Sequence, residues 1–87
     1  MRCFVGGSVA YKDGDKEECA EGASITLYDG AGNKIGEQLT DNYGDFKFDD
    51  LAENSGKYKI AVAFRDNAIK EIEIDLKDSL YTGVILV

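Results

Sequence analysis

Four aspartates of this sequence come closest to a catalytic arrangement: Asp41, Asp45, Asp49 and Asp50. Hydrolysis of a glycosidic bond, for example, needs two carboxylates opposed across a cleft. Asp41 and Asp45, however, flank an expected turn, where Asp is favoured because its side chain accepts hydrogen bonds from the backbone. A sheet protein of 87 residues also has little room for such a cleft. We therefore expect these acids to stabilise local structure, and we expect the chain to contain no catalytic residue.

The segment Asp13 to Glu18 (D-G-D-K-E-E) begins like a calcium-binding loop. An EF-hand loop needs Gly at its sixth position and Glu at its twelfth, but those positions hold Glu18 and Ser24. The sequence also has no His, the commonest general base and neutral metal ligand. We expect a solvated loop here and no metal-binding residue in the chain.

The two cysteines, Cys3 and Cys19, are too few for an iron–sulfur cluster or a tetrahedral zinc site. Whether they form a disulfide with each other stays open at this point. Two unbridged thiols would suit a reducing cytoplasm. The cysteines therefore predict no cofactor in this chain.

The chain carries a net charge of −7 over 87 residues, which is the length of one domain. Nucleic acids and anionic membrane surfaces select basic patches, so neither is an expected partner. The acidity indicates solubility or, as a sharper alternative, attraction of a basic partner. No apolar stretch approaches the roughly 20 residues of a membrane span. The strand-like run that follows Met1-Arg2 at once, without an apolar leader, favours a domain cut from a longer chain.

Short apolar segments separated by turn residues predict an all-β protein. No window shows the 3.6-residue apolar period of a helix, and the segment 12–22 is polar enough to be a loop. We expect a seven-stranded antiparallel β-sandwich. The expected strands are 3–11, 23–28, 34–40, 45–48, 57–64, 71–76 and 81–87.

The strands 57–64 and 71–76 alternate strictly between apolar and polar residues, and Arg65-Asp66-Asn67 forms a turn between them. One register places apolar residues opposite apolar ones and Lys opposite acids, as cross-strand pairing favours. That register pairs Phe64 with Ala68, Ile60 with Ile72, Tyr58 with Ile74, Lys59 with Glu73 and Lys57 with Asp75.

Three further positions carry specific expectations. Gly6-Gly7 marks a bulge or a close approach of another backbone. Leu51 is expected to fill the core beside Phe46 and Phe48. The run 84–87 (V-I-L-V) has no polar face, so it is expected in the middle of a sheet, buried on both sides.

Four sequence segments carry a resemblance to a known family: V-G-G-S-V (5–9), E-G-A-S-I-T-L-Y-D (21–29), T-D-N-Y-G-D-F-K-F-D-D-L (40–51) and G-K-Y-K-I-A-V (56–62). Together they resemble the transthyretin-like sandwiches, which include carboxypeptidase regulatory-like domains and collagen-adhesin B-type repeats. The resemblance implies a transthyretin (prealbumin)-like fold but no particular function. The adhesin repeats often join a Lys of the first strand to an Asn of the last. Here Lys12 is present, but 81–87 contains no Asn.

A narrower resemblance rests on 19–23 (C-A-E-G-A), 41–46 (D-N-Y-G-D-F) and 78–86 (D-S-L-Y-T-G-V-I-L). These segments are similar to the C-terminal β-domain of 4Fe-4S subunits in anaerobic molybdopterin oxidoreductases of the pyrogallol–phloroglucinol transhydroxylase type. The resemblance implies that residues 1–87 are one domain from the C-terminal part of a bacterial, cytoplasmic protein, with the clusters bound upstream. Its partner would be the catalytic subunit or its own ferredoxin-like part. The alternative is an extracellular carbohydrate- or protein-binding or spacer module of a surface protein.

Overall fold

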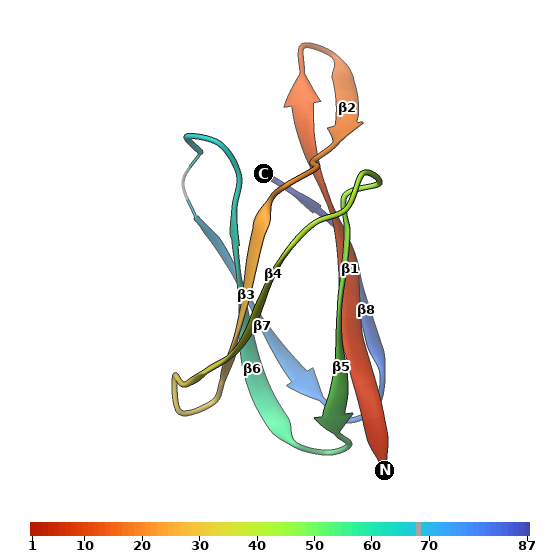
Figure 1. The fold of residues 1–87 in the computed structure, drawn as a ribbon, viewed down its shortest axis with the longest axis vertical. Coiled ribbons are helices and arrows are strands. Elements are labelled where there is room, and N and C mark those ends of the chain that lie inside the picture. Colours follow the sequence, from red (N-terminus) through yellow and green to blue (C-terminus); the bar gives the residue numbers. More distant parts are fainter. Residues whose placement is uncertain (68) are drawn as a thin grey trace.

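A computed structural model describes residues 1–67 and 69–87, and its strands form two facing sheets (Figure 1). No helix occurs among the described residues, so none there is long and apolar enough to cross a membrane. The eight strands are β1 (Arg2–Asp13), β2 (Lys16–Cys19), β3 (Ser24–Asp29), β4 (Lys34–Leu39), β5 (Asp45–Ala52), β6 (Gly56–Ala63), β7 (Lys70–Leu76) and β8 (Leu80–Leu86). The all-β sandwich architecture predicted from the sequence is confirmed.

Sheet A is organised around β1, which is long enough to hold three neighbours. Its first half pairs with β5 and its last residues pair with β2, both antiparallel, while β8 runs parallel to it on the other side. The expectation of a purely antiparallel sandwich is therefore wrong at β8. A parallel neighbour needs a long connection along the chain, and here everything between β1 and β8 provides it.

The expected loop 12–22 is also wrong in part, because it contains β2. Lys16 to Cys19 pair with the end of β1 across a two-residue turn, Gly14-Asp15, which raises the strand number from seven to eight. All four residues of β2 are exposed. A hairpin that extends into solvent needs no apolar face, so hydrophobic alternation could not reveal this one.

Sheet B has the order β4-β3-β6-β7 and contains the predicted hairpin in its predicted register. Tyr58 lies opposite Ile74, and Lys59 lies opposite Glu73. The other two predicted pairs in the described residues, Ile60 with Ile72 and Lys57 with Asp75, are also formed. The expected partner of Phe64, Ala68, lies outside the described residues.

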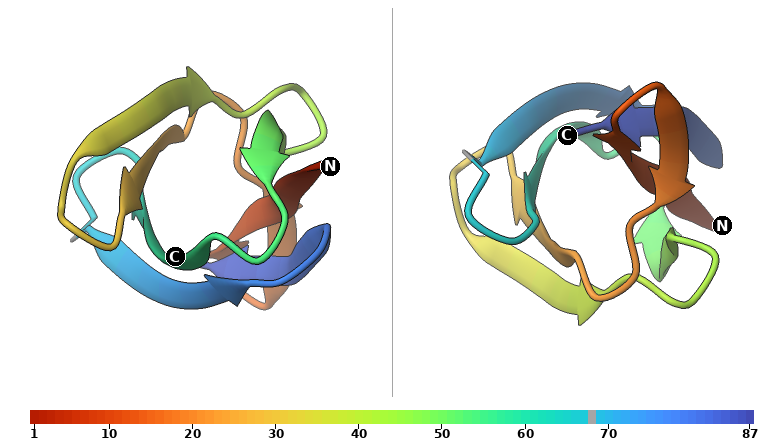
Figure 2. Two further views of the ribbon diagram at one scale, coloured as in Figure 1. Left: turned by 90° about the horizontal axis from the view of Figure 1, so that it is seen from below. Right: turned by 90° about the horizontal axis from the view of Figure 1, so that it is seen from above.

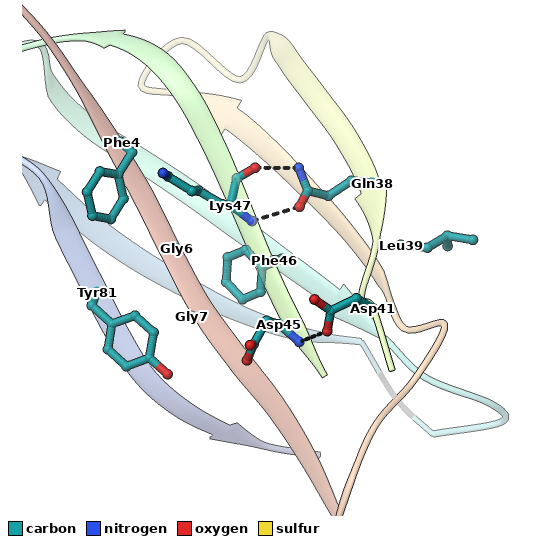
Figure 3. Close-up of a pocket in the computed structure, with 10 residues that line it drawn as sticks. All are labelled: Phe4, Gly6, Gly7, Gln38, Leu39, Asp41, Asp45, Phe46, Lys47 and Tyr81. Atoms are coloured by element: carbon teal, nitrogen blue, oxygen red, sulfur yellow. Dashed lines mark hydrogen bonds between the residues drawn. The ribbon is translucent and has the colours of Figure 1, made fainter. Parts of the chain in front are cut away.

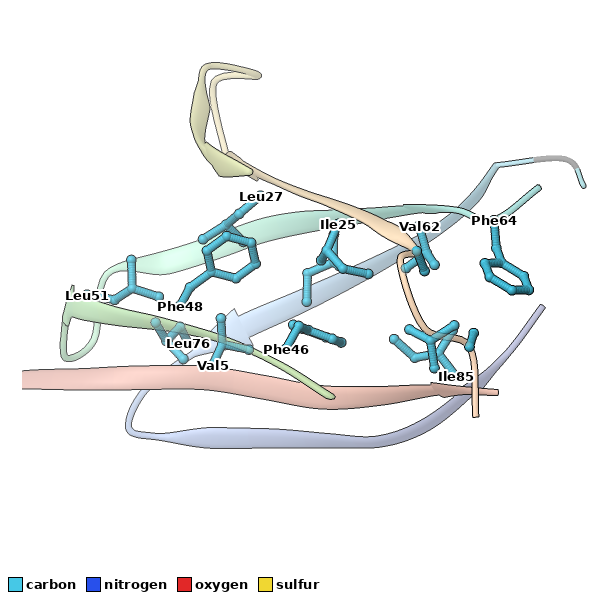
Figure 4. Close-up of a cluster of buried hydrophobic side chains, with 14 of the residues drawn as sticks. Val5, Ile25, Leu27, Phe46, Phe48, Leu51, Val62, Phe64, Leu76 and Ile85 are labelled. Atoms are coloured by element: carbon cyan, nitrogen blue, oxygen red, sulfur yellow. The ribbon is translucent and has the colours of Figure 1, made fainter. Parts of the chain in front are cut away.

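The core lies between the two sheets, which curl around it (Figure 2). Figure 4 shows side chains of both sheets meeting there, with Phe46, Phe48 and Leu51 of β5 facing Ile25 and Leu27 of β3. Leu51 is buried as predicted, although its strand extends to Ala52 rather than ending at residue 48.

The expectation that 84–87 lies in mid-sheet, buried on both faces, is wrong. β8 pairs only with β1 and therefore forms an edge of sheet A. Ile85 is buried in the core, but Val84 is 59% exposed and Leu86 is 38% exposed. The apolar run looked doubly buried because its outward side chains are apolar as well, yet no described segment covers the outer face of sheet A.

Candidate functional site

A groove of about 460 Å³ runs over the outer face of sheet A and extends past β5 to Gln38 and Leu39 at the end of β4 (Figure 3). Gly6 forms its floor, where the lack of a side chain leaves a gap between Phe4 and Ser8, the outward neighbours along β1. A Cβ at Gly6 would lie 3.0 Å from the Phe46 carbonyl oxygen, so the predicted close backbone approach is confirmed. We call this hollow the Gly6 groove.

One wall of the Gly6 groove is an aromatic ring with an ammonium group over it. Lys47 Nζ of β5 lies 4.6 Å from the centroid of the Phe4 ring. The same ammonium lies 3.4 Å from Asp49 Oδ1, so its charge is already balanced locally. Lys47 is therefore held by two partners and closes this side of the groove.

The opposite wall contains Asp45 of β5 and Tyr81 of β8, whose side chains are joined by hydrogen bonds through Ser8 of β1. Ser8 Oγ of β1 donates to Asp45 Oδ1 of β5. Tyr81 OH of β8 lies 2.9 Å from the same Ser8 oxygen. Because Ser8 gives its single hydroxyl proton to Asp45, Tyr81 donates to Ser8. The Tyr81 side chain is tethered at its tip and yet 61% exposed.

This constellation can bind polar groups, and among the described residues it does not include the oriented base of a serine nucleophile. A serine nucleophile needs an adjacent general base that is itself held by a third group. Among the described residues, the Ser8 hydroxyl is hydrogen-bonded to a carboxylate and a phenol, and the sequence contains no His. The arrangement therefore suits recognition of a ligand with hydrogen-bond donors or positive charge.

Asp41, the first of the predicted architectural acids, organises the turn at one end of the groove. Its Oδ1 accepts hydrogen bonds from the backbone N–H groups of Tyr43 and Asp45, both at 2.9 Å. Its own N–H donates to the Asp45 carbonyl. The predicted role of Asp41 is confirmed. Asp45 joins the turn through its backbone only, and its side chain accepts a hydrogen bond from Ser8 instead.

The other two aspartates of the predicted group lie apart from this arrangement. Asp49 pairs with Lys47 on the outer face. Asp50 adopts a left-handed backbone conformation (φ 61°), and its carbonyl oxygen accepts a hydrogen bond from Arg2. The structure thus brings Asp41 and Asp45 together in the lining of the Gly6 groove, whereas Asp49 and Asp50 line a separate hollow with Arg2 and Phe4.

The acidic segment Asp13 to Glu18 forms the β1–β2 hairpin instead of the predicted loop. Its acids are exposed, and Glu17 lies 3.9 Å from the ammonium of Lys12. Within residues 1–67 and 69–87, no group of three or more Asp, Glu, Cys or His side chains is placed to hold a metal ion.

Cys3 lies near the start of β1, Cys19 ends β2, and both thiols are free. Cys19 sits opposite Ala10, seven residues along β1 from Cys3, which corresponds to roughly 20 Å at the usual rise per residue. Cys19 is exposed, while Cys3 is buried. Burial raises the pKa of the Cys3 thiol, and the nearby charges of Asp78 and Glu53 raise it further. This keeps Cys3 in its unreactive thiol form.

A second ordered turn lies at the far end of sheet B, between β3 and β4. The Asp29 carboxylate accepts hydrogen bonds from the Asn33 N–H at 2.8 Å and from the Asn33 side-chain amide at 3.2 Å. It also accepts one from the Ala31 N–H at 3.0 Å. These bonds lower the pKa of Asp29, and the hydrogen bond from the Asn33 backbone N–H contributes most to this shift. Asp29 is thus a structural acid.

Sequence reasoning missed Phe4, Tyr81 and Gln38, which border the Gly6 groove. The outward alternation Asp45, Lys47 along β5 indicated an exposed polar face. It could not indicate that β8 lies beside β1, because the pairing of distant strands is not encoded in alternation.

Comparison with models of known protein families gives no match for this chain. Comparison with curated proteins gives none either. The structure itself defines the architectural class of the protein. It is a β-sandwich of two four-stranded sheets with a groove on the outer face of sheet A.

Proposed function

We propose that this chain is a non-catalytic accessory domain that docks a protein partner through the outer face of sheet A. One observation carries the proposal: among the eight strands of the described part of the chain, β8 alone has no charged residue. It nevertheless lies at an edge, with Tyr81, Val84 and Leu86 exposed. Exposed apolar edge strands invite association unless they are covered.

The Gly6 groove lies directly beside these side chains and adds polar anchors to the same face. Aromatic residues are enriched in the centres of protein interfaces, and Phe4 and Tyr81 flank the groove. We call the combined surface the docking face: Phe4, Tyr81, Val84, Leu86 and the Gly6 groove. A face that combines apolar contact with a few placed polar groups suits a protein partner better than a polyanion.

The parent that we propose is the 4Fe-4S subunit of an anaerobic, cytoplasmic molybdopterin oxidoreductase. Support comes from the resemblance of 41–46 and 78–86 to the C-terminal domain of such subunits, which belongs to the transthyretin-like sandwiches. The partner would be the catalytic subunit or the ferredoxin-like part of the same protein. The domain itself would hold no cofactor and would stabilise the assembly.

An affinity experiment tests this proposal. The 87-residue chain is immobilised, exposed to an extract of its source cells, and the retained proteins are identified by mass spectrometry. We expect an iron–sulfur or molybdopterin oxidoreductase subunit to be retained and to be lost with Val84→Lys. The matched control is Ile35→Lys, which places the same charge at a residue of β4 that is 48% exposed.

Equal retention by wild type and Val84→Lys would contradict docking through β8. Retention of no oxidoreductase subunit would contradict the proposed parent. Specific retention of a surface protein or polysaccharide would instead support the alternative, an extracellular binding or spacer module.

A further inference from the structure

We propose that the Gly6 groove receives an arginine side chain of the protein partner, stacked on Tyr81 and hydrogen-bonded to Asp45. This inference rests on the proposed docking function and specifies the chemistry of the partner at its central contact. It is carried by the geometry of the two groove walls and by the charges that they display.

The Tyr81 ring is the aromatic surface available to an incoming group. Lys47 of this same chain already lies over the Phe4 ring, at 4.6 Å from its centroid. Tyr81, in contrast, is 61% exposed and has no cation over it among the described residues. Its hydroxyl is tethered to Ser8, so the ring is held in place before a ligand arrives. Such preorganisation lowers the entropy cost of binding.

The charge of the groove favours a cation. Asp45 uses Oδ1 to accept from Ser8, and its Oδ2 has no hydrogen-bond partner among the described residues. Asp41 adds a second carboxylate to the lining. The one cation in the lining, Lys47, is balanced by Asp49 at 3.4 Å. The net charge of −7 would also steer a basic segment toward this surface.

Arginine fits this combination better than lysine does. Its planar guanidinium can stack on an aromatic ring while its edge donates to a carboxylate, whereas the lysine ammonium is a compact and strongly hydrated point charge. The chain itself contains an example of this chemistry. Arg65 lies over the rings of Tyr11 and Phe64, at 4.4 and 4.7 Å, and donates to Tyr11 OH.

A peptide titration tests the inference directly. The ¹⁵N-labelled 87-residue chain is titrated with acetyl-Gly-Arg-Gly-amide and, as a control, with the peptide that carries neutral citrulline in place of Arg. We expect the Arg peptide to shift the amide signals of Gly6, Gly7 and Tyr81, and the citrulline peptide to leave them unmoved. Higher salt should weaken the effect, because the attraction is between partly exposed charges.

Two variants identify the contacts. Asp45→Asn should weaken binding of the Arg peptide about tenfold, since a hydrogen bond to a charged group is lost. Asp75→Asn changes the net charge equally on β7 of sheet B and should leave the affinity unchanged. Tyr81→Leu should weaken binding about threefold, as expected for an exposed cation–π contact. An amide spectrum of each variant shows whether it is folded.

Equal shifts with Arg and citrulline, or none with either, would overturn the inference. Shifts of the same amides by the neutral trisaccharide maltotriose but not by the Arg peptide would assign the groove to sugars and also overturn it. The docking proposal fails separately. If wild type and Asp45→Asn retain an oxidoreductase subunit equally, the result supports docking through this face and contradicts the proposed arginine contact.

Discussion

The side chain of Gln38 on β4 pairs with the backbone of Lys47 on β5 as a neighbouring strand would. Its Nε2 donates to the Lys47 carbonyl at 2.8 Å, and its Oε1 accepts from the Lys47 N–H at 2.7 Å. β4 and β5 belong to different sheets. One amide side chain thus joins the two sheets and satisfies part of the open edge of β5, which otherwise invites pairing with other chains.

We predict that Gln38→Ala destabilises the domain by roughly 1–2 kcal/mol, because two hydrogen bonds of the usual net strength are lost. Urea unfolding measures the free energy, and hydrogen exchange should show faster exchange of the Lys47 amide. The matched control is Glu37→Ala, which removes an exposed residue of the same strand whose carboxylate lies 3.0 Å from Lys34. Similar losses in both variants would show that the Gln38 contact contributes nothing specific.

Gly7 is predicted to tolerate no side chain, because the Phe46 ring packs against it. A Cβ there would lie 3.0 Å from that ring and would collide with Thr82 Oγ1. Gly7→Ala should therefore cost roughly 1–3 kcal/mol, the usual cost of overpacking. Adding Thr82→Ala should recover part of the loss in a double-mutant cycle measured by thermal unfolding. Strictly additive effects would show that the two positions are not coupled.

The β6–β7 register predicts that charge-changing substitutions at the adjacent residues Ile60 and Lys59 have very different effects on stability. Ile60 is fully buried, so Ile60→Glu places a charge in the core and should largely unfold the domain. Lys59 faces solvent opposite Glu73 and lies 3.3 Å from Glu71, so Lys59→Glu should cost only roughly 0.2–1 kcal/mol. Circular dichroism and urea unfolding distinguish the two outcomes. Equal, small effects of both substitutions would contradict the register.

The lowered pKa of Asp29 predicts that the free energy of unfolding of the domain depends on pH. Its pKa is lowered from 3.8 in the folded chain, so the ionised carboxylate stabilises the fold above the unfolded-state pKa. That contribution is lost as the pH falls through the lower, folded pKa. The stability advantage of wild type over Asp29→Asn should thus be full at pH 7 and vanish in strong acid, as urea midpoints across pH would show.

The Asp29 titration midpoint can also be followed by ¹³C NMR. Asn33→Ala removes the side-chain donor but keeps the backbone N–H, so it should move the midpoint only part of the way back to 3.8. A wild-type midpoint at or above 3.8 would contradict the assigned role of these hydrogen bonds.

Local patterns predicted those parts of the fold whose two faces differ in polarity. Strict alternation of 57–64 and 71–76 was enough to predict the pairs Tyr58–Ile74 and Lys59–Glu73, because a slip by one residue would exchange buried and exposed sides. The pattern failed for β2, which is exposed all round, and for β8, whose two faces are both apolar. Where the faces do not differ, alternation carries no information about burial.

The sequence by itself determined the all-β class, the core-facing residues of β5 and β6, and the architectural use of Asp41, because these depend on near neighbours in the chain. Only the tertiary structure decided that β8 lies parallel to β1 at an open edge and that Phe4, Asp45 and Tyr81 line the groove with Gly6. Ser8 and Tyr81 are 73 residues apart, yet their oxygens lie at 2.9 Å. Contacts at such separation depend on how whole sheets pack and pair, which no local pattern of residues specifies.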